Sequence, residues 1–204
     1  MVVGAMYNVV DSIFVGRGVG EVALTAVTIA FPLMTILMAV GMLVGLGAAS
    51  VVSISLGQKD KFKAERTLGN ALTMMVVFVL STTGFILWQL EWLLVSCLGV
   101  TAEVLPYAAD FVSIILLGSL FLHVGFGLNA VVRAQGDPKT ALATQVISAF
   151  VNAVLNYLFI FEFGWGIKGS ATATVIAQAV AAVWVMTHFI RGQGVLRLRW
   201  IHLR

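Results

Sequence analysis

Long runs without a charged residue divide the sequence into hydrophobic segments. An opening run, Met1–Gly16, is interrupted only by Asp11. Five further runs follow it: Val22–Gln58, Thr67–Leu90, Phe111–Val132, Thr140–Phe161 and Gly169–Ile190. Each of the last four holds 22 to 24 residues, or about 33–36 Å of helix at about 1.5 Å per residue, and a bilayer core needs about 20. The pattern predicts an all-α, polytopic membrane protein with a six-transmembrane-helix bundle.

The composition agrees with this class and excludes several others. The chain is 60% hydrophobic and 10% charged, with a mean hydropathy of +1.04, whereas soluble domains carry about 25% charged residues. The net charge of +3 resides in the gaps between runs, so it does not indicate nucleic-acid binding. The single cysteine, Cys97, excludes an internal disulfide. The opening run lacks the basic start of a signal peptide.

Basic residues are concentrated in alternate gaps. Ten of the twelve lie after the second and fourth runs and after the last: Lys59, Lys61, Lys63, Arg66, Arg133, Lys139, Arg191, Arg197, Arg199 and Arg204. The other gaps hold Arg17 and Lys168 with Glu21, Glu91, Glu103 and Glu162. Because cytoplasmic loops are enriched in Lys and Arg, we expect both termini on the cytoplasmic side of a cell membrane.

Both ends of the sequence depart from a regular span. The opening run provides only about 24 Å of helix, too short to cross a bilayer comfortably. We assign residues 1–191 to the six-helix lobe and residues 192–204 to an amphipathic cytoplasmic tail. The tail alternates basic and apolar residues, which suits either a segment lying in the lipid headgroups or the start of a linker to more protein. The linker is the favoured interpretation.

Asp11 is the first candidate for chemistry. A carboxylate within a spanning helix costs about 2.5–3.5 kcal/mol on insertion scales, and such residues usually face a cavity or bind protons or ions. Tyr7 and Asn8 precede it by four and three residues, so they share its helical face. The alternative is that Asp11 lies near the outer headgroups, six residues before Arg17. Cation binding is the favoured interpretation, with Na⁺ as one possible ion.

The fifth run carries a polar stripe. Its members recur every three or four residues and therefore share a face: Gln145, Ser148, Asn152 and Asn156. Such a face either lines a polar cavity or makes hydrogen bonds between helices, typically about 0.6 kcal/mol per contact. Other polar residues that could complete a cavity are Asn129, Thr172, Thr174 and Gln178.

Other residues favour packing over catalysis. Gly41 and Gly45 form a small-residue pair suited to close helix contact. His123 fits either a hydrogen-bonded packing role or a proton relay. No spacing of His, Cys and carboxylates suggests a metal cluster, and no nucleophile–base pair lies within the runs. The sequence therefore predicts a protein that is not an enzyme and needs no cofactor beyond a coupling ion.

Three stretches resemble the multidrug and toxic compound extrusion (MATE) family. Residues 7–17 (YNVVDSIFVGR) are similar to its first-helix signature, residues 133–139 (RAQGDPK) to the loop after its fourth helix, and residues 173–178 (ATVIAQ) to a sixth-helix segment. The resemblance implies the N-terminal lobe of a twelve-helix bacterial antiporter built of two six-helix lobes. Organic, often cationic, compounds would leave the cell while H⁺ or Na⁺ enters.

The resemblance also assigns site residues. Asp11 matches the carboxylate that binds the coupling cation. The positions that resemble the polar network around this carboxylate are Asn129, Asn152, Asn156 and Thr174. Tyr7, Asn8, Gln145, Ser148 and Gln178 are possible cavity-lining residues. Many members carry a second aspartate where this chain has Asn156. A Na⁺ site with one carboxylate and several amide or hydroxyl oxygens therefore becomes as plausible as a proton relay.

The implied partners are small organic substrates, the lipid bilayer and a second six-helix lobe, from the same parent chain or a second copy. Two alternatives remain open. The first is a related lipid-linked oligosaccharide flippase, which a cavity rich in Arg and Lys would favour, but these runs lack such residues. A non-transporting membrane assembly protein would use its polar stripes only as interhelical contacts.

Overall fold

The fold is entirely helical over the part of the chain that the structure describes. The structure is a computed structural model. It describes residues 2–192 and 194–198, except for the side chains of residues 2–8 and 10. The elements in chain order are α1 (Val2–Gly18), α2 (Glu21–Gly57), α3 (Lys61–Trp88), α4 (Leu90–Trp92), the π-helical turn η1 (Leu93–Cys97), α5 (Leu105–Ala134), α6 (Pro138–Tyr157), the π-helical turn η2 (Leu158–Glu162) and α7 (Gly166–Arg191).

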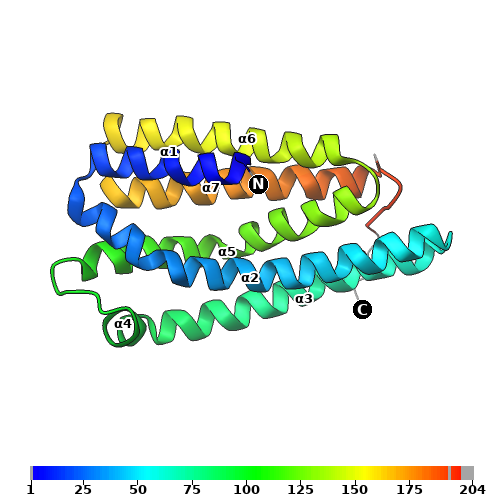
Figure 1. The fold of residues 1–204 in the computed structure, drawn as a ribbon, viewed down its shortest axis with the longest axis horizontal. Coiled ribbons are helices and arrows are strands. Elements are labelled where there is room, and N and C mark those ends of the chain that lie inside the picture. The colour runs from blue at the N-terminus through cyan, green and yellow to red at the C-terminus, as the bar shows by residue number, and fades with distance from the viewer. Residues whose placement is uncertain (1, 193, 199–204) are drawn as a thin grey trace.

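Five of these helices are long and apolar enough to cross a membrane: α2, α3, α5, α6 with η2, and α7. Helix α1 has 17 residues, about 25 Å, and begins part-way along the bundle (Figure 1). The all-α membrane fold is confirmed. The expected count of six spans stays a prediction, since among the described residues five helices are long enough and α1 is shorter.

The turns follow the local sequence. Asp60 and Asp137 accept hydrogen bonds from the N–H groups of Lys63 and Thr140, both at 3.0 Å, and so cap the starts of α3 and α6. Gly192 ends α7 with a φ of 62°, a left-handed conformation that suits glycine. The tight connections between successive helices therefore have local causes.

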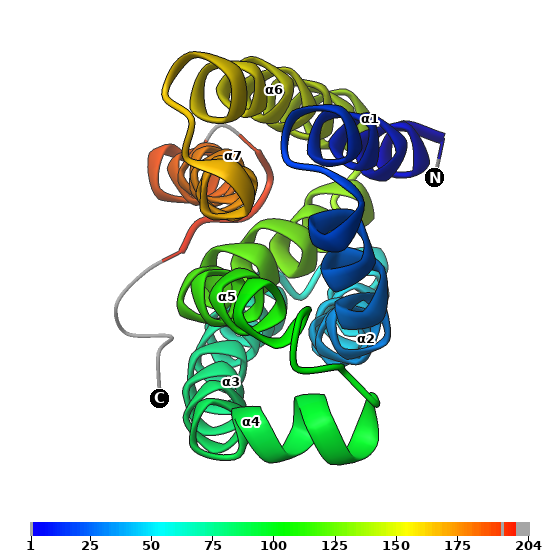
Figure 2. The same ribbon diagram turned by 90° about the vertical axis from the view of Figure 1, so that its left-hand side faces the viewer.

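Helix α5 lies in the middle of the bundle. Viewed along the helices, α1, α6 and α7 lie on one side of it and α2 and α3 on the other (Figure 2). Within its most apolar window 67% of α5 is buried, against 17–39% for the other four spans. The remaining helices therefore pack around α5, and they leave apolar faces exposed, as expected of helices that contact lipid.

Glycines allow α2 to approach α5 closely. A Cβ atom added to Gly45 would lie 2.6 Å from the Cα of Gly127, and one added to Gly41 would lie 2.6 Å from Cδ2 of His123. Both glycines are buried. The close packing predicted for this pair of small residues is present in the structure.

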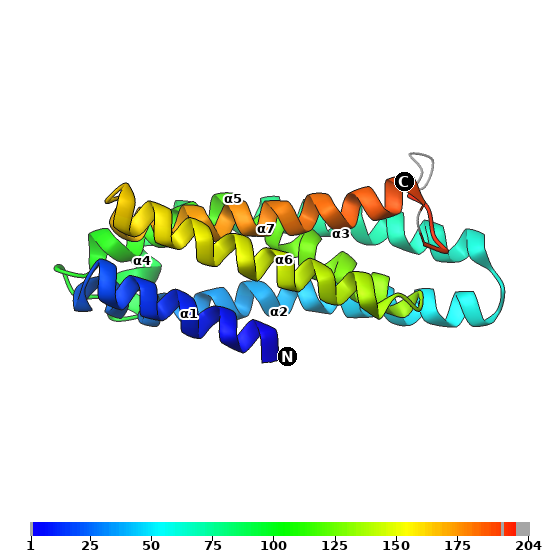
Figure 3. The ribbon, with the colours of Figure 1, turned by 90° about the horizontal axis from the view of Figure 1, so that it is seen from above.

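The two ends of the bundle differ in charge. The α2–α3 loop, the α5–α6 loop and the described part of the tail lie at one end, and the α1–α2 and α6–α7 loops lie at the other (Figures 1 and 3). The first end, here called the basic end, carries the eight described basic residues of the alternate gaps: Lys59, Lys61, Lys63, Arg66, Arg133, Lys139, Arg191 and Arg197. At the opposite end Lys168 pairs with Asp110 at 3.2 Å.

Two features go beyond the sequence interpretation. Helix α2 is continuous over 37 residues with Pro32 inside it, and its first turns are bent relative to the rest of the helix (Figure 1), as a proline can cause.

The segment Leu90–Cys97 forms the short helix α4 and the turn η1, which the sequence analysis treated as part of a gap. Trp88 and Trp92 are exposed there.

The described part of the tail folds back onto the basic end. Leu196 is fully buried and belongs to the apolar cluster around Leu68, Val131 and Phe189. The part of the predicted tail beyond Leu198 lies outside the described residues.

Candidate functional site

The candidate site is built around Asp11 on α1. Its side chain is buried, with 8% of the residue exposed. Its Oδ1 atom accepts hydrogen bonds from Nδ2 of Asn156 at 2.8 Å and from Oγ of Ser170 at 3.1 Å. Three helices, α1, α6 and α7, therefore meet at one carboxylate oxygen.

The network continues along α6 and α7. Nδ2 of Asn156 also donates to Oδ1 of Asn152 at 3.1 Å, and Nδ2 of Asn152 donates to Oγ1 of Thr174 at 3.2 Å. Asn152 and Asn156 are four residues apart on α6, as are Ser170 and Thr174 on α7, so each pair shares a helical face. Two adjacent polar faces thus enclose the carboxylate.

The side-chain oxygen of Asn156 is a hydrogen-bond acceptor without a partner among the described residues. A carboxylate in its ionised form only accepts hydrogen bonds, so Nδ2 of Asn156 faces Asp11 and its Oδ1 faces elsewhere. Among the described residues, this buried Oδ1 atom has no hydrogen-bond partner. Leaving a buried acceptor unpaired costs about 1–3 kcal/mol. The site therefore combines a buried carboxylate with a free amide oxygen, which is suited to a small cation.

The depth of Asp11 follows from its position in α1. It lies seven residues before Gly18, about 10 Å of helix, and Ser170 lies four residues into α7. The site is therefore in the half of the bundle nearer the end opposite the basic end. Its burial between α6 and α7 separates it from the exposed side of α1, where an open groove is lined by Val9, Ser12, Ile13, Gly16, Arg17 and Leu24.

The structure brings together four of the five residues expected around the cation: Asp11, Asn152, Asn156 and Thr174. Asn129 lies elsewhere. Its Nδ2 donates to the carbonyl oxygen of Ala141 at 2.9 Å, and its Oδ1 accepts from Arg133 at 3.0 Å. Because Asn129 is five residues from the end of α5, it joins α5 to α6 near the basic end.

The possible cavity-lining residues divide in a similar way. Ser148 donates to the carbonyl oxygen of Ala177 at 3.0 Å, an interhelical bond between α6 and α7. Gln145 and Gln178 are partly buried, and within the described chain Oε1 of Gln178 has no partner. The side chains of Tyr7 and Asn8 lie outside what the structure describes.

Ser170 is the site residue that the sequence analysis missed. Its position four residues before Thr174 was the available signal, because residues at that spacing share a helical face. Small hydroxyl residues are frequent in membrane helices, where they commonly bond to their own backbone. The spacing alone therefore did not distinguish Ser170 from its neighbours.

His123 takes part in a separate contact. Its Nδ1 lies 2.7 Å from the carbonyl oxygen of Ser119, and its Nε2 lies 2.9 Å from that of Leu37 on α2. The ring thus bridges α5 and α2. Over the residues described, the structure contains no group of three or more His, Cys, Asp or Glu side chains that could hold a metal ion.

Comparisons with known proteins fit this arrangement. The chain is 25% identical to multidrug export protein MepA of Staphylococcus saprophyticus over 212 residues, which cover 100% of the chain and 46% of that protein. It is also 25% identical to MepA of Staphylococcus aureus strain NCTC 8325 over 195 residues, covering 94% of the chain and 42% of that protein. The chain spans less than half the length of these curated relatives.

Solved structures share the fold. An outward-facing multidrug resistance MATE family transporter of the MOP superfamily matches with a TM-score of 0.93 and 25% identity, covering 100% of this chain and 45% of the other. A crystal structure of MATE in the bent conformation matches with a TM-score of 0.91 and 24% identity, covering 97% and 44%. The model of the family described as MatE matches residues 1–158. The chain belongs to the MatE family.

Proposed function

We propose that this chain forms one lobe of a secondary-active exporter of organic compounds, and that Asp11 binds the coupling cation. The proposal rests on the buried carboxylate of Asp11, which receives two donors while the adjacent Oδ1 of Asn156 has none among the described residues. Family membership and the multidrug export proteins among the relatives support the export of organic compounds. A second lobe would complete the central cavity.

Either coupling cation would satisfy the free oxygen of Asn156. Na⁺ is held by carboxylate and amide oxygens, which are hard ligands of the type that alkali and alkaline-earth cations prefer. A proton on the second oxygen of Asp11 would instead let the carboxyl group donate to Asn156. In both cases the negative charge of Asp11 is neutralised, which removes an attraction for a cationic substrate.

Transport would follow from this competition. A ligand shifts a conformational equilibrium only through its different affinity for the two states. Cation binding at Asp11 changes the polar contacts that join α1 to α6 and α7, and so biases the arrangement of this lobe. Alternating access would then involve movement of the two lobes relative to each other.

The orientation of the chain in the membrane is part of the same proposal. Of the ten basic residues in the alternate gaps, the eight that the structure describes lie at the basic end, and Lys and Arg are enriched in cytoplasmic loops. We therefore assign the basic end to the cytoplasm. The Asp11 site then lies in the half of the membrane nearer the external side.

Thermal unfolding in lipid nanodiscs tests cation binding. A ligand that binds only the folded state stabilises it by about 2.7 kcal/mol at a hundred times its Kd. We expect NaCl to raise the Tm of the wild-type chain relative to choline chloride at equal ionic strength, and we expect Asp11→Asn to abolish the rise. Asp110→Asn is the matched control, since Asp110 is an exposed carboxylate paired with Lys168.

Proton coupling is measured on the same samples. If H⁺ is the ion, the Tm of the wild type depends on pH more strongly than that of Asp11→Asn, and NaCl has no specific effect. An Asp11→Asn chain with the same Na⁺ and pH responses as the wild type would refute the site. Efflux of a cationic dye from vesicles that contain both lobes then tests export, and a non-transporting assembly protein would show none.

A further inference from the structure

The tail is held at the basic end by three consecutive backbone N–H groups. Leu196 N donates to Oε1 of Gln135 at 3.4 Å, Arg197 N donates to Oε1 of Glu65 at 3.1 Å, and Leu198 N donates to the carbonyl oxygen of Phe189 at 3.2 Å. The acceptors come from the end of α5, the start of α3 and the end of α7. Each N–H thus joins the tail to a different helix.

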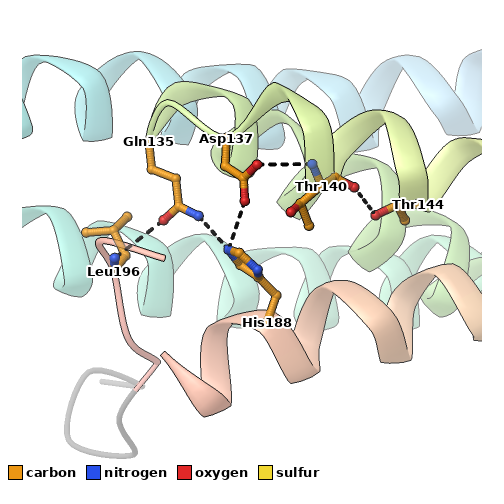
Figure 4. Close-up of polar contacts among 6 residues, drawn as sticks. All are labelled: Gln135, Asp137, Thr140, Thr144, His188 and Leu196. Carbon is orange, nitrogen blue, oxygen red and sulfur yellow. Dashed lines mark hydrogen bonds and ion pairs between the residues drawn. The ribbon is translucent and has the colours of Figure 1, made fainter. Parts of the chain in front are cut away.

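The contact at Leu196 determines the orientation of Gln135. Figure 4 shows the Gln135 side chain between Leu196 and His188. A backbone N–H only donates, so the amide oxygen of Gln135 must face Leu196 and its NH₂ group must face His188. The amide orientation is therefore fixed by a donor that cannot change its role.

The state of His188 follows from this orientation. Nε2 of Gln135 lies 2.8 Å from Nε2 of His188. Since the amide nitrogen is the donor, the ring nitrogen must accept with its lone pair, and the ring carries its proton on Nδ1. The attached tail therefore requires a neutral His188.

A charged His188 would need a different neighbour. With a proton on Nε2 the ring would face the NH₂ group of Gln135 donor to donor. Rotating the amide would give the ring an acceptor, but it would then turn the NH₂ group toward the N–H of Leu196. The proton on His188 and the Leu196 contact thus compete for the single oxygen of Gln135.

The carboxylate of Asp137 lies next to the His188 ring and would stabilise its charged form. Oδ2 of Asp137 lies 4.0 Å from Nε2 of His188, while Oδ1 of Asp137 caps α6 through Thr140 (Figure 4). Hydrogen bonds from Thr140 lower the pKa of Asp137 below its ordinary value of 3.8, so Asp137 is anionic at neutral pH. The other described charged side chains at this end are Lys59 and Asp60 in the α2–α3 loop, Lys61, Lys63, Glu65 and Arg66 on α3, Arg133 on α5, Lys139 on α6, Arg191 on α7 and Arg197 in the tail.

The tail packs tightly against the buried side chains of His188 and Gln135. His188 and Gln135 are buried, with 4% and 9% of each residue exposed. A Cβ atom added to Gly194 would lie 2.5 Å from Nε2 of Gln135 and 2.8 Å from Nε2 of His188. The tail therefore passes directly against the Gln135–His188 contact, and a side chain at position 194 would displace Gln135 or His188.

We propose that His188 and Gln135 form a proton-controlled latch for the tail. The tail is attached when His188 is neutral. It is released when His188 binds a proton and donates to the oxygen of Gln135, with Asp137 beside the ring to stabilise its charge. Histidine is the side chain that ordinarily changes charge between about pH 5 and about pH 8, so acidification of the basic end opens the latch. This inference is independent of cation binding at Asp11, and its test needs no transport.

Hydrogen–deuterium exchange of the tail amides in nanodiscs tests the latch. All chains are compared at the same pH at the amides of Leu196, Arg197 and Leu198, whose local sequence is the same in every variant, so intrinsic exchange rates cancel. We expect equal protection at about pH 8 in the wild type and His188→Gln, whose side-chain oxygen still accepts from Gln135. At about pH 5.5 we expect the wild type to be severalfold less protected than His188→Gln, and one bound proton can change the equilibrium by at most about tenfold per pH unit. Glu65 is present in both chains, so its own titration cancels.

Two further variants make the result specific. Gln135→Glu provides two acceptor oxygens, one for Leu196 and one for a protonated His188, so its tail should stay protected at both pH values. Gly194→Ala should expose the tail at both, which sets the level for an open latch. The latch is refuted if wild type and His188→Gln share one pH profile, or if Gln135→Glu loses protection in acid as the wild type does.

Discussion

Asn156 lies between Asp11 and Asn152, and its Nδ2 donates to Oδ1 of Asp11 at 2.8 Å. The two residues are 145 positions apart in the chain, on α1 and α6. The donor thus faces the carboxylate, and the Oδ1 atom of Asn156 is left free among the described residues. The negative charge of Asp11 and the unpaired oxygen of Asn156 therefore lie in one site.

Asn156→Leu should weaken cation binding. The substitution removes the free acceptor that would contact a bound cation, and a contact to a charged group is worth about 1.5–3 kcal/mol. We expect the cation Kd to rise by about 10-fold to 100-fold, measured by titrating the Tm with NaCl or with pH. Val154→Leu, at an exposed position on the same helix, should leave the Kd unchanged. An unaltered Kd in Asn156→Leu would remove Asn156 from the site.

Ser170→Ala should have a smaller effect of the opposite sign. Its Oγ donates to Asp11 at 3.1 Å, which favours the cation-free carboxylate, and Asn156 still donates to the same oxygen in the variant. A loss of about 1 kcal/mol from the cation-free state predicts a Kd about fivefold lower. Thr172→Ala on the same helix is the control, since the Thr172 hydroxyl bonds to the backbone of Lys168. Equal effects of the two variants would contradict a direct role for Ser170.

Gly45→Ala should destabilise the bundle. The new methyl group would lie 2.6 Å from the Cα of Gly127 and 3.0 Å from its carbonyl oxygen, so α2 and α5 must separate. Overpacking of this kind costs about 1–3 kcal/mol, and we expect a lower Tm in detergent micelles. Gly47→Ala meets no atom within 4 Å, so its Tm should match or exceed that of the wild type. If both variants unfold alike, the close contact is not limiting.

Acid should weaken the start of α6 through Asp137. Hydrogen bonds from the side chain and backbone of Thr140 lower the pKa of Asp137 below 3.8, and His188 and Lys139 add to this shift. A lowered pKa in the folded state means that the contribution is complete above about pH 4 and is lost as the pH falls through the folded value. Asp137→Asn keeps a capping oxygen that does not titrate.

The measurement is the Tm difference between wild type and Asp137→Asn. The difference should favour the wild type near neutral pH and shrink below about pH 4. Because the Asp137 side chain is 34% exposed, solvent screening keeps the effect small. A difference that stays constant down to about pH 3 would contradict the ionised cap.

The helices were predictable because their causes are local. Charge-free runs predicted α2, α3, α5, α6 and α7 to within six residues at each end, and the capping aspartates Asp60 and Asp137 lie just before two of them. The family resemblance, carried by short stretches such as residues 133–139, is confirmed by the family model. The short helix α4 was not predicted, because the acidic residues around it read as a gap.

The candidate site was only partly predictable. Helical spacing identified Asn152 and Asn156 as one face, but spacing within a helix does not say which helix the face meets. Asn129 appeared equivalent on resemblance, yet it bonds to Ala141 and Arg133 near the basic end. The roles of these residues in cation binding stay predictions until the binding experiments are done.

The sequence by itself determined the class of the protein, the extent of its spans and the segregation of basic residues, because insertion and topology depend on local hydrophobicity and charge. Only the tertiary structure decided which polar groups meet. Contacts such as Ser170 with Asp11 and Gln135 with His188 join residues 159 and 53 positions apart. They depend on the packing of α1, α5 and α7, and hydrogen bonds require partners within about 3 Å, a precision that periodicity along one helix does not contain.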